Sequence, residues 1–139
     1  MSLVLDASLA LSWYFEDERT PAIDGVLDEV AASGAVVPSL WRMEVANGLQ
    51  MAVRCKRIDI DFRDHAIRQL SLLPIVVDRE TDTYVWTATL PLSDRFGLTV
   101  YDAAYLELAQ RRNLPLASID KALSAAGQRL GVQTLGLKR

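Results

Sequence analysis

The chain has 139 residues, half of them hydrophobic, one cysteine and a formal net charge of −3. These values indicate a single globular domain over residues 1–139 and argue against a disordered chain. The lone cysteine excludes an internal disulfide and a thiolate metal cluster. No apolar run approaches the roughly 18 residues of a membrane span, and the N-terminus lacks the basic region of a signal peptide. We therefore expect a cytoplasmic protein with no membrane partner.

Short apolar runs alternate with longer amphipathic segments along the chain, as in proteins built from βαβ units. The predicted strands are, in chain order, 3–5, 35–37, 74–77, 115–119 and 132–135. The predicted helices lie at about 22–32, 39–56, 60–72, 80–92, 102–112 and 120–129. These apolar runs are too short to form helices, and their residues suit the strands of a buried parallel sheet. The sequence thus predicts an α/β fold, an open and mostly parallel sheet covered by helices on both sides.

Acidic residues stand where several of these elements begin or end. Asp6 follows the first predicted strand directly and is the only charged residue in 1–15. Asp120 ends the fourth predicted strand, and Asp102 stands near the start of the helix that leads into it. Glu44 lies about one turn inside the helix after the second strand. Ligands of such sheets gather beyond the carboxyl ends of the strands, so we expect the four carboxylates to converge there.

Four carboxylates at one place predict a site for a divalent metal. Like charges raise one another's pKa unless a cation neutralises them, and carboxylate oxygens are the ligands that hard divalent metals prefer. The chain has one histidine and one cysteine, which makes zinc a poor fit. Mg²⁺ or Mn²⁺ fits better, and such a site suits phosphodiester hydrolysis by a metal-activated water.

Each acid also has a simpler local interpretation. Aspartate is a common N-cap, and Asp6, Asp102 and Asp120 each stand where a helix can begin. Thr99 and Asp102 match the capping-box spacing, in which Asp102 bonds back to the Thr99 amide. Glu44 is compatible with a solvated helix face. One side chain can cap a helix and bind a metal, so the residues alone leave both interpretations open.

Three stretches of the chain resemble the PIN-domain ribonucleases of the VapC toxin type. They are "LVLDASLALSWYFEDE", "PSLWRMEVANGLQMAVRCKRI" and "LTVYDAAYLELAQRRNLPLASIDKAL". They occur in the family's order and cover nearly the whole chain. The resemblance implies a three-layer α/β/α sandwich with about five short strands. It also implies a Mg²⁺- or Mn²⁺-dependent endoribonuclease that is the toxin of a type II toxin–antitoxin pair.

The resemblance also assigns roles to individual residues. Four of them are implied to be the catalytic acids and metal ligands: Asp6, Glu44, Asp102 and Asp120. Asn47 and Ser118 are implied to support them by orienting carboxylates or waters. Ser8 either gives similar support or caps the first helix, and we favour the cap. Gly48 stands where the family more usually has alanine, and a glycine inside a helix costs about 1 kcal/mol relative to alanine.

The partners implied by the resemblance are an RNA substrate, a second copy in a homodimer and a cognate antitoxin protein laid across a groove. Two alternative functions remain. The first is a PIN-like domain serving mainly as a protein-binding module, although all four acidic positions are filled here. The second is a housekeeping RNA-processing nuclease without an antitoxin. A neighbouring gene for a small DNA-binding protein would favour the toxin.

Overall fold

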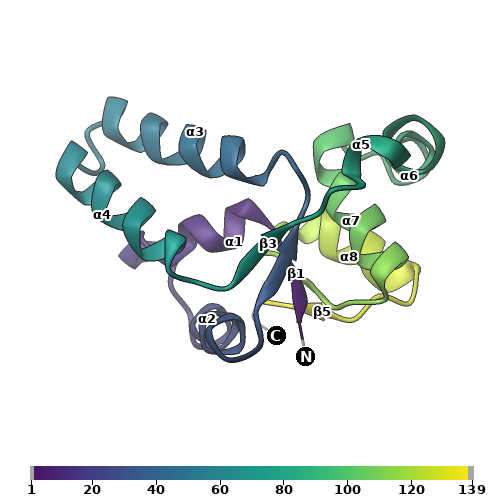
Figure 1. The fold of residues 1–139 in the computed structure, drawn as a ribbon, viewed down its shortest axis with the longest axis horizontal. Helices are drawn as coiled ribbons and strands as arrows, with labels where there is room; N and C mark the ends of the chain where they lie inside the picture. The colour runs from purple at the N-terminus through teal and green to yellow at the C-terminus, as the bar shows by residue number, and fades with distance from the viewer. Residues whose placement is uncertain (1, 138–139) are drawn as a thin grey trace.

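The computed structural model describes residues 2–137 and contains a five-stranded sheet in which every neighbouring pair of strands is parallel (Figure 1). The strands are β1 (Leu3–Leu5), β2 (Ala35–Val37), β3 (Ile75–Val77), β4 (Leu116–Ala117) and β5 (Thr134–Leu135). The first two lie where they were predicted, whereas the last three are shorter than predicted. The flanking residues of these apolar runs still make single backbone hydrogen bonds to a neighbouring strand, as between the Ser118 N–H and the Leu135 carbonyl at 3.0 Å, but they lie outside the regular strand pairing.

Ten helical segments accompany the sheet in the described part of the chain. They are α1 (Ala7–Ser12), η1 (Glu16–Glu18), α2 (Pro21–Ser33), α3 (Trp41–Arg54), α4 (Ile60–Ser71), α5 (Thr81–Tyr84), η2 (Val85–Thr89), α6 (Leu90–Phe96), α7 (Val100–Arg112) and α8 (Lys121–Arg129). Helix α1 was not among the predicted helices. Its six residues are too few to display the period by which amphipathic helices are recognised.

The predicted helix at 80–92 is a composite of α5, η2 and α6 that continues to Phe96. Segment η2 is a π-helical turn directly before α6, whose second residue is Pro91. Proline has no N–H to donate, and its ring clashes with the carbonyl four residues earlier. A π turn at this point lets the helix continue past the proline. Gly97 then ends α6 in the left-handed conformation, with φ of 66°.

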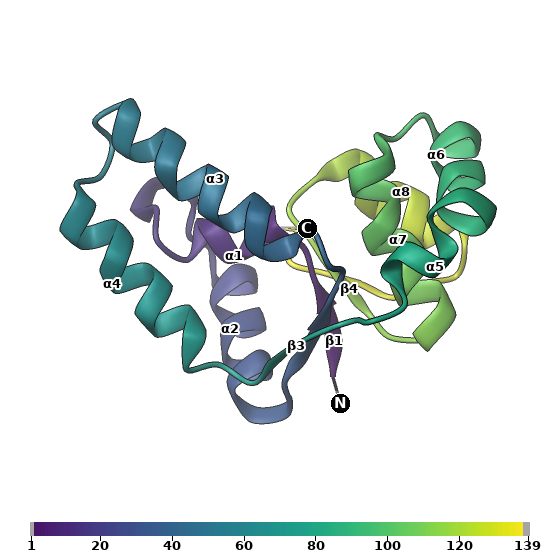
Figure 2. The same ribbon diagram turned by 45° about the horizontal axis from the view of Figure 1, so that its top comes forward.

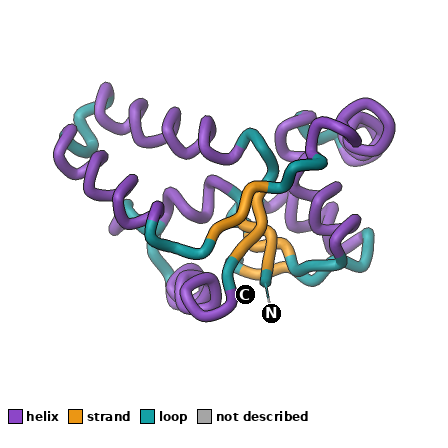
Figure 3. The backbone as a smooth tube through the Cα atoms, viewed as in Figure 1, coloured by secondary structure: helices purple, strands orange, loops and turns teal. Residues whose placement is uncertain are grey.

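The helices form two layers, one on each side of the sheet, as predicted. Helices α1–α4 lie on one side and α5–α8 on the other, and the same separation is visible in both ribbon views and in the tube view (Figures 1, 2 and 3). The strand order is β3-β2-β1-β4-β5, so the chain proceeds outward from β1 in one direction and then from β4 in the other. The order reverses between β1 and β4. Open α/β sheets bind ligands at this switch point, beyond the carboxyl ends of the strands.

The core is built around β1 and α7. Leu3, Val4 and Leu5 of β1 are essentially inaccessible to solvent, and every residue of α7 from Ala103 to Ala109 is buried. Helix α7 packs against β1 and β4 and, on its other flank, against α6 and α8. It is therefore apolar on nearly all sides. This explains the apolar run from Ala103 to Leu106, which directly follows the half-buried Asp102.

An ion-pair cluster joins α7 to the edge strand β3. Asp78 directly follows β3, and its Oδ2 lies 2.7 Å from Nη2 of Arg111 on α7. Nε of Arg111 lies 2.7 Å from Oε2 of Glu107, one turn earlier on the same helix. Both carboxylates are buried, so the guanidinium is the group that makes their burial tolerable.

No helix in residues 2–137 is long and apolar enough to cross a membrane.

Candidate metal and catalytic site

The carboxyl end of β1 places Asp6 against Ser118, which follows β4. The backbone N–H of Asp6 donates to the carbonyl of Ala117 at 2.9 Å, which extends the pairing of the two strands by one residue. The Asp6 residue is only 5% exposed, and its Oδ2 accepts hydrogen bonds from Ser8 Oγ and Ser118 Oγ, each at 2.7 Å. Asp6 occupies the N-cap position of α1 but makes no capping hydrogen bond with its side chain. Its carboxylate is therefore held by two hydroxyls and does not cap the helix.

The two serines have different positions and a common partner. Ser8 is the second residue of α1 and donates to Asp6, so the expectation that Ser8 caps the helix is wrong. A residue inside the first turn points its hydroxyl back along the helix, where the Asp6 carboxylate lies. Ser118 Oγ also accepts the backbone N–H of Asp120 at 3.0 Å. One buried hydroxyl thus connects Asp6 with the loop that carries Asp120.

Asp120 and Asp102 both lie at helix starts, but only one of them caps. Strand β4 ends at Ala117, so Asp120 does not end the strand as predicted and is instead the N-cap of α8. Its Oδ1 accepts the Leu123 N–H at 2.9 Å. Asp102 is the third residue of α7, and its N–H donates to Oγ1 of the capping residue Thr99 at 3.1 Å. The capping interpretation therefore holds for Asp120, while at α7 the cap is Thr99.

Glu44 approaches the same region from α3. Its Oε1 accepts a hydrogen bond of 2.5 Å from the hydroxyl of Tyr105 on α7. Sequence reasoning missed Tyr105, although it lies three residues after Asp102 and is therefore on the same face of α7. Asn47, the other predicted supporting residue on α3, is exposed and makes no hydrogen bond to the four acids within residues 2–137. The structure thus brings Glu44 to the site with Tyr105 as its partner.

The pKa directions show that the four acids act on one another. Burial raises the pKa of Asp6, and the charge of Asp120 adds to this effect. Burial also raises the pKa of Glu44, as do the charges of Asp6 and Asp102. The pKa of Asp102 is raised by burial and by the charges of Asp6 and Asp120. Four carboxylates from separate parts of the chain therefore lie close enough for their charges to affect one another, around Asp6 at the end of β1.

The chemistry of these donors fits a hard divalent cation. All of them are carboxylate oxygens, and the repulsion that helps burial to raise the pKa values of Asp6, Glu44 and Asp102 is the cost that such a cation removes. In their present positions, no three His, Cys, Asp or Glu side chains of the described residues form a closed ligand set.

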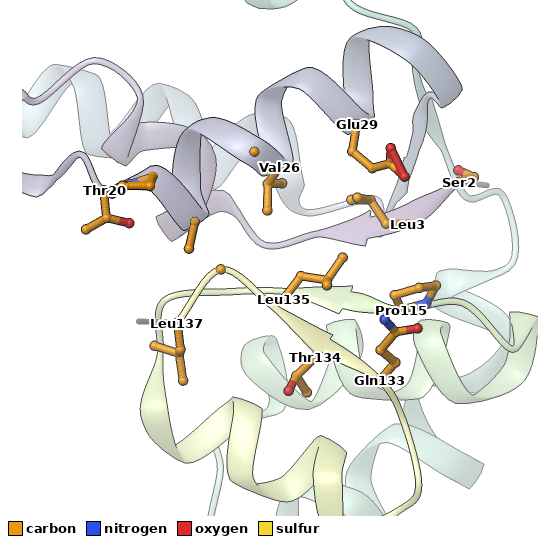
Figure 4. A pocket seen from close by; sticks show the side chains of 14 residues that line it. Ser2, Leu3, Thr20, Val26, Glu29, Pro115, Gln133, Thr134, Leu135 and Leu137 are labelled. Atoms are coloured by element: carbon orange, nitrogen blue, oxygen red, sulfur yellow. The ribbon is translucent and has the colours of Figure 1, made fainter. Parts of the chain in front are cut away.

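A separate cavity of about 780 Å³ lies between α2 and β5 (Figure 4). Part of its lining precedes the strands, at Ser2, Pro115 and Gln133, on the amino side of the sheet. Apolar side chains such as Val26 and Leu135 form much of the remainder. None of the four acids lines it, so the cavity is not part of the acidic site.

Comparisons with known proteins agree with this geometry. The sequence matches the PIN domain family over residues 3–128. Ribonuclease VapC3 of Pyrobaculum aerophilum is 27% identical over 124 residues, which are 89% of this chain and 93% of that protein. The crystal structure of PAE2754 from Pyrobaculum aerophilum superposes with a TM-score of 0.69 at 22% identity, covering 96% of this chain and 83% of that one. A toxin–antitoxin complex from Klebsiella pneumoniae has a chain of TM-score 0.58 and 15% identity, covering 85% and 86% of the two chains.

Proposed function

The chain belongs to the PIN domain family, and on that premise we propose that it is a metal-dependent endoribonuclease and the toxin of a toxin–antitoxin pair. The observation that carries this proposal is the gathering of four acids at the switch point of the sheet. The similarity to Ribonuclease VapC3 supports the nuclease activity. The similarity to the Klebsiella pneumoniae toxin–antitoxin complex supports the role as a toxin.

In this proposal the acids hold Mg²⁺ or Mn²⁺ and the serines orient them. The metal ligands are Asp6, Glu44, Asp102 and Asp120. When bound, the metal activates a water for hydrolysis of an RNA phosphodiester bond and offsets the negative charge that develops. Ser8 and Ser118 direct Oδ2 of Asp6, and Asp120 keeps its place by capping α8. Asn47 makes no such contact within residues 2–137, so we propose no supporting role for it.

The test is cleavage of structured RNA by the purified chain in the presence of Mg²⁺ or Mn²⁺. We expect Asp6→Asn and Asp102→Asn to reduce the rate by at least about 100-fold, because losing even an outer partner of a metal ligand costs about 10–100-fold. Asp28→Asn is the matched control, since Asp28 is an exposed acid on α2. Cleavage by both site variants at the parental rate would show that the acidic site is assigned wrongly.

The toxin role requires a protein partner, and we propose that this partner is the product of an adjacent reading frame. Co-expression should yield a complex in which RNA cleavage is suppressed. Cleavage without any such neighbour would identify a housekeeping nuclease, whereas a tight complex without cleavage would identify a binding module. We further propose that the chain is one domain and forms a homodimer, which light scattering would report as twice the monomer mass.

A further inference from the structure

The hydrogen bond between Tyr105 and Glu44 joins the two helical layers. Glu44 belongs to α3, on one side of the sheet, and Tyr105 belongs to α7, on the other side (Figures 1 and 2). The phenol hydroxyl donates to Oε1 of Glu44 at 2.5 Å. Charge-assisted hydrogen bonds of this length are among the stronger ones in proteins. This contact therefore constrains the position of Glu44 relative to α7.

Packing alone does not account for a tyrosine at position 105. The residue is fully buried, and its ring fills a place in the core that a phenylalanine ring would fill equally well. A buried hydroxyl costs free energy unless it has a hydrogen-bond partner, and here that partner is Glu44. Glu44, in contrast, is only partly buried, so water would satisfy its carboxylate without the tyrosine. The hydroxyl therefore fixes the orientation of the Glu44 carboxylate.

The orientation of the Glu44 carboxylate matters because Asp102 lies on the same face of α7 as Tyr105. Tyr105 comes one helical turn after Asp102, so the helix that presents Asp102 also presents the hydroxyl that holds Glu44. Carboxylates that bind metals are usually hydrogen-bonded in turn, and such partners set their orientation. Ser8 and Ser118 provide these bonds for Asp6, and they are local to the ends of β1 and β4. Glu44 comes from a different helix and layer, and its partner is Tyr105.

We propose that Tyr105 is the positioning residue for Glu44, whose carboxylate its hydroxyl holds toward Asp102 in the orientation that binds the divalent metal. This inference rests on the proposed function, because it takes Glu44 to be a metal ligand. Tyr105 itself touches neither metal nor RNA in this role. It acts through Glu44, so removing the hydroxyl should change metal affinity only while Glu44 is present.

The test is a double-mutant cycle read out by Mn²⁺ binding without RNA, using calorimetric titration of the full chain. Tyr105→Phe removes one oxygen and keeps the ring in the core, and we expect it to weaken Mn²⁺ binding about tenfold. Glu44→Gln should weaken binding at least as much. In the Glu44→Gln background, Tyr105→Phe should then have no further effect. Tyr101→Phe is the control, because Tyr101 lies on the same helix with its side chain in solvent.

Each alternative outcome overturns a distinct statement. Parental Mn²⁺ affinity in Tyr105→Phe, or an equal loss with and without the Glu44 carboxylate, would overturn the positioning role. Parental affinity in Glu44→Gln would overturn the proposed ligand set, and the positioning role with it. If Tyr105→Phe melts well below the parent, the cycle is measured at a temperature at which circular dichroism shows all four proteins to be folded. The expected tenfold loss and its dependence on Glu44 are the same there.

Discussion

Asp120 combines two functions that single substitutions can separate. Its Oδ1 caps α8 by accepting the Leu123 N–H, and its charge raises the pKa values of Asp6 and Asp102. Asparagine keeps an oxygen for the cap and loses the charge, whereas alanine loses both. Sequence reasoning recognised both interpretations of Asp120 but had no means of choosing, because the cap is local and the charge acts on residues far away in the chain.

We expect Asp120→Asn to lose RNA cleavage while its free energy of unfolding stays near that of the parent. Asp120→Ala should lose cleavage equally and be less stable by about 1 kcal/mol, the usual cost of removing an N-cap. Urea denaturation and the RNA assay measure the two effects separately. Equal stability of the two variants would show that the cap contributes little, and cleavage by Asp120→Asn would show that the charge is not needed.

At the scale of the elements, Gly48 lets α3 approach α1 closely. A Cβ at this position would run into the side chain of Leu11, with Cδ2 only 3.1 Å away. The glycine therefore does more than weaken the helix, as its sequence position alone suggests. Helix α1 begins directly after Asp6, and α3 carries Glu44, so this contact helps to set the distance between two of the acids.

We expect Gly48→Ala to lower the free energy of unfolding by about 1 kcal/mol. Overpacking costs about 1–3 kcal/mol, which exceeds the gain of up to about 1 kcal/mol in helix propensity. Gly25→Ala is the matched control on α2, where a Cβ would meet no atom within 4 Å. That variant should gain about 0.5–1 kcal/mol. If both variants gain stability in urea denaturation, Leu11 moves aside and the close approach is not required.

The Asp78–Arg111 ion pair is the second contact that positions an element of the site. It links the end of β3 to the last turn of α7, the helix that carries Asp102 and Tyr105. Although burial acts in the opposite direction, hydrogen bonds from Arg111 and Thr81 hold the pKa of Asp78 below its ordinary value of 3.8. The charged form of Asp78 is therefore the one that stabilises the fold.

We expect Asp78→Asn to lower the free energy of unfolding by about 2–3 kcal/mol at pH 7, because it removes the charge that accepts hydrogen bonds from Arg111, while Glu107 and Glu80 remain as partners of the guanidinium. The stability that Asp78 contributes is present above pH 3.8 and is lost as the pH falls through its depressed pKa, so the two proteins should converge in strong acid. Glu80→Gln is the control, because Glu80 is an exposed partner of the same arginine and should contribute less than about 1 kcal/mol. Equal losses in both variants would contradict a special role for the buried pair.

At the scale of the whole molecule, the fold holds like charges together. The acids arrive from β1, α3, α7 and α8, and their mutual repulsion adds to the cost of burying Asp6. Because burial raises the pKa of Asp6 above 3.8, the folded chain keeps this proton to a higher pH than the unfolded chain does. The contribution of Asp6 to stability is thus most favourable below pH 3.8 and declines as the pH rises through its folded pKa.

We expect Mn²⁺ to reverse this decline. In the presence of a chelator, Asp6→Asn should be more stable than the parent at pH 7 by about 0.5–2 kcal/mol, as is common when a site optimised for function is relieved. Mn²⁺ at 100 times its dissociation constant should stabilise the parent by about 2.7 kcal/mol and the variant much less. Thermal unfolding with and without Mn²⁺ gives both differences. Equal stabilisation of the two proteins would place the metal away from Asp6.

Features that depend on neighbours along the chain could be predicted from the sequence. The apolar runs predicted β1 and β2 because three consecutive apolar residues are enough to form a short buried strand. The position of Asp6 directly after β1 followed from the same run, and the helix starts at Asp120 and Thr99 followed from local capping chemistry. The resemblance to a known family extended this to the fold and to the four acids.

The partners that hold those acids depend on contacts between elements. The resemblance implied that Ser118 supports the acids but did not identify Asp6 as its partner, and nothing in the sequence identified Tyr105 as the partner of Glu44. Ser118 reaches Asp6 across 112 positions of the chain, and Tyr105 reaches Glu44 across 61. Neither contact can be predicted from a periodic pattern. The first depends on how β1 pairs with β4, and the second depends on how far packing separates α3 from α7. The same packing left Asn47 in solvent despite its helical register with Glu44. Local sequence places a side chain on an element, and only the contacts between elements determine what that side chain meets.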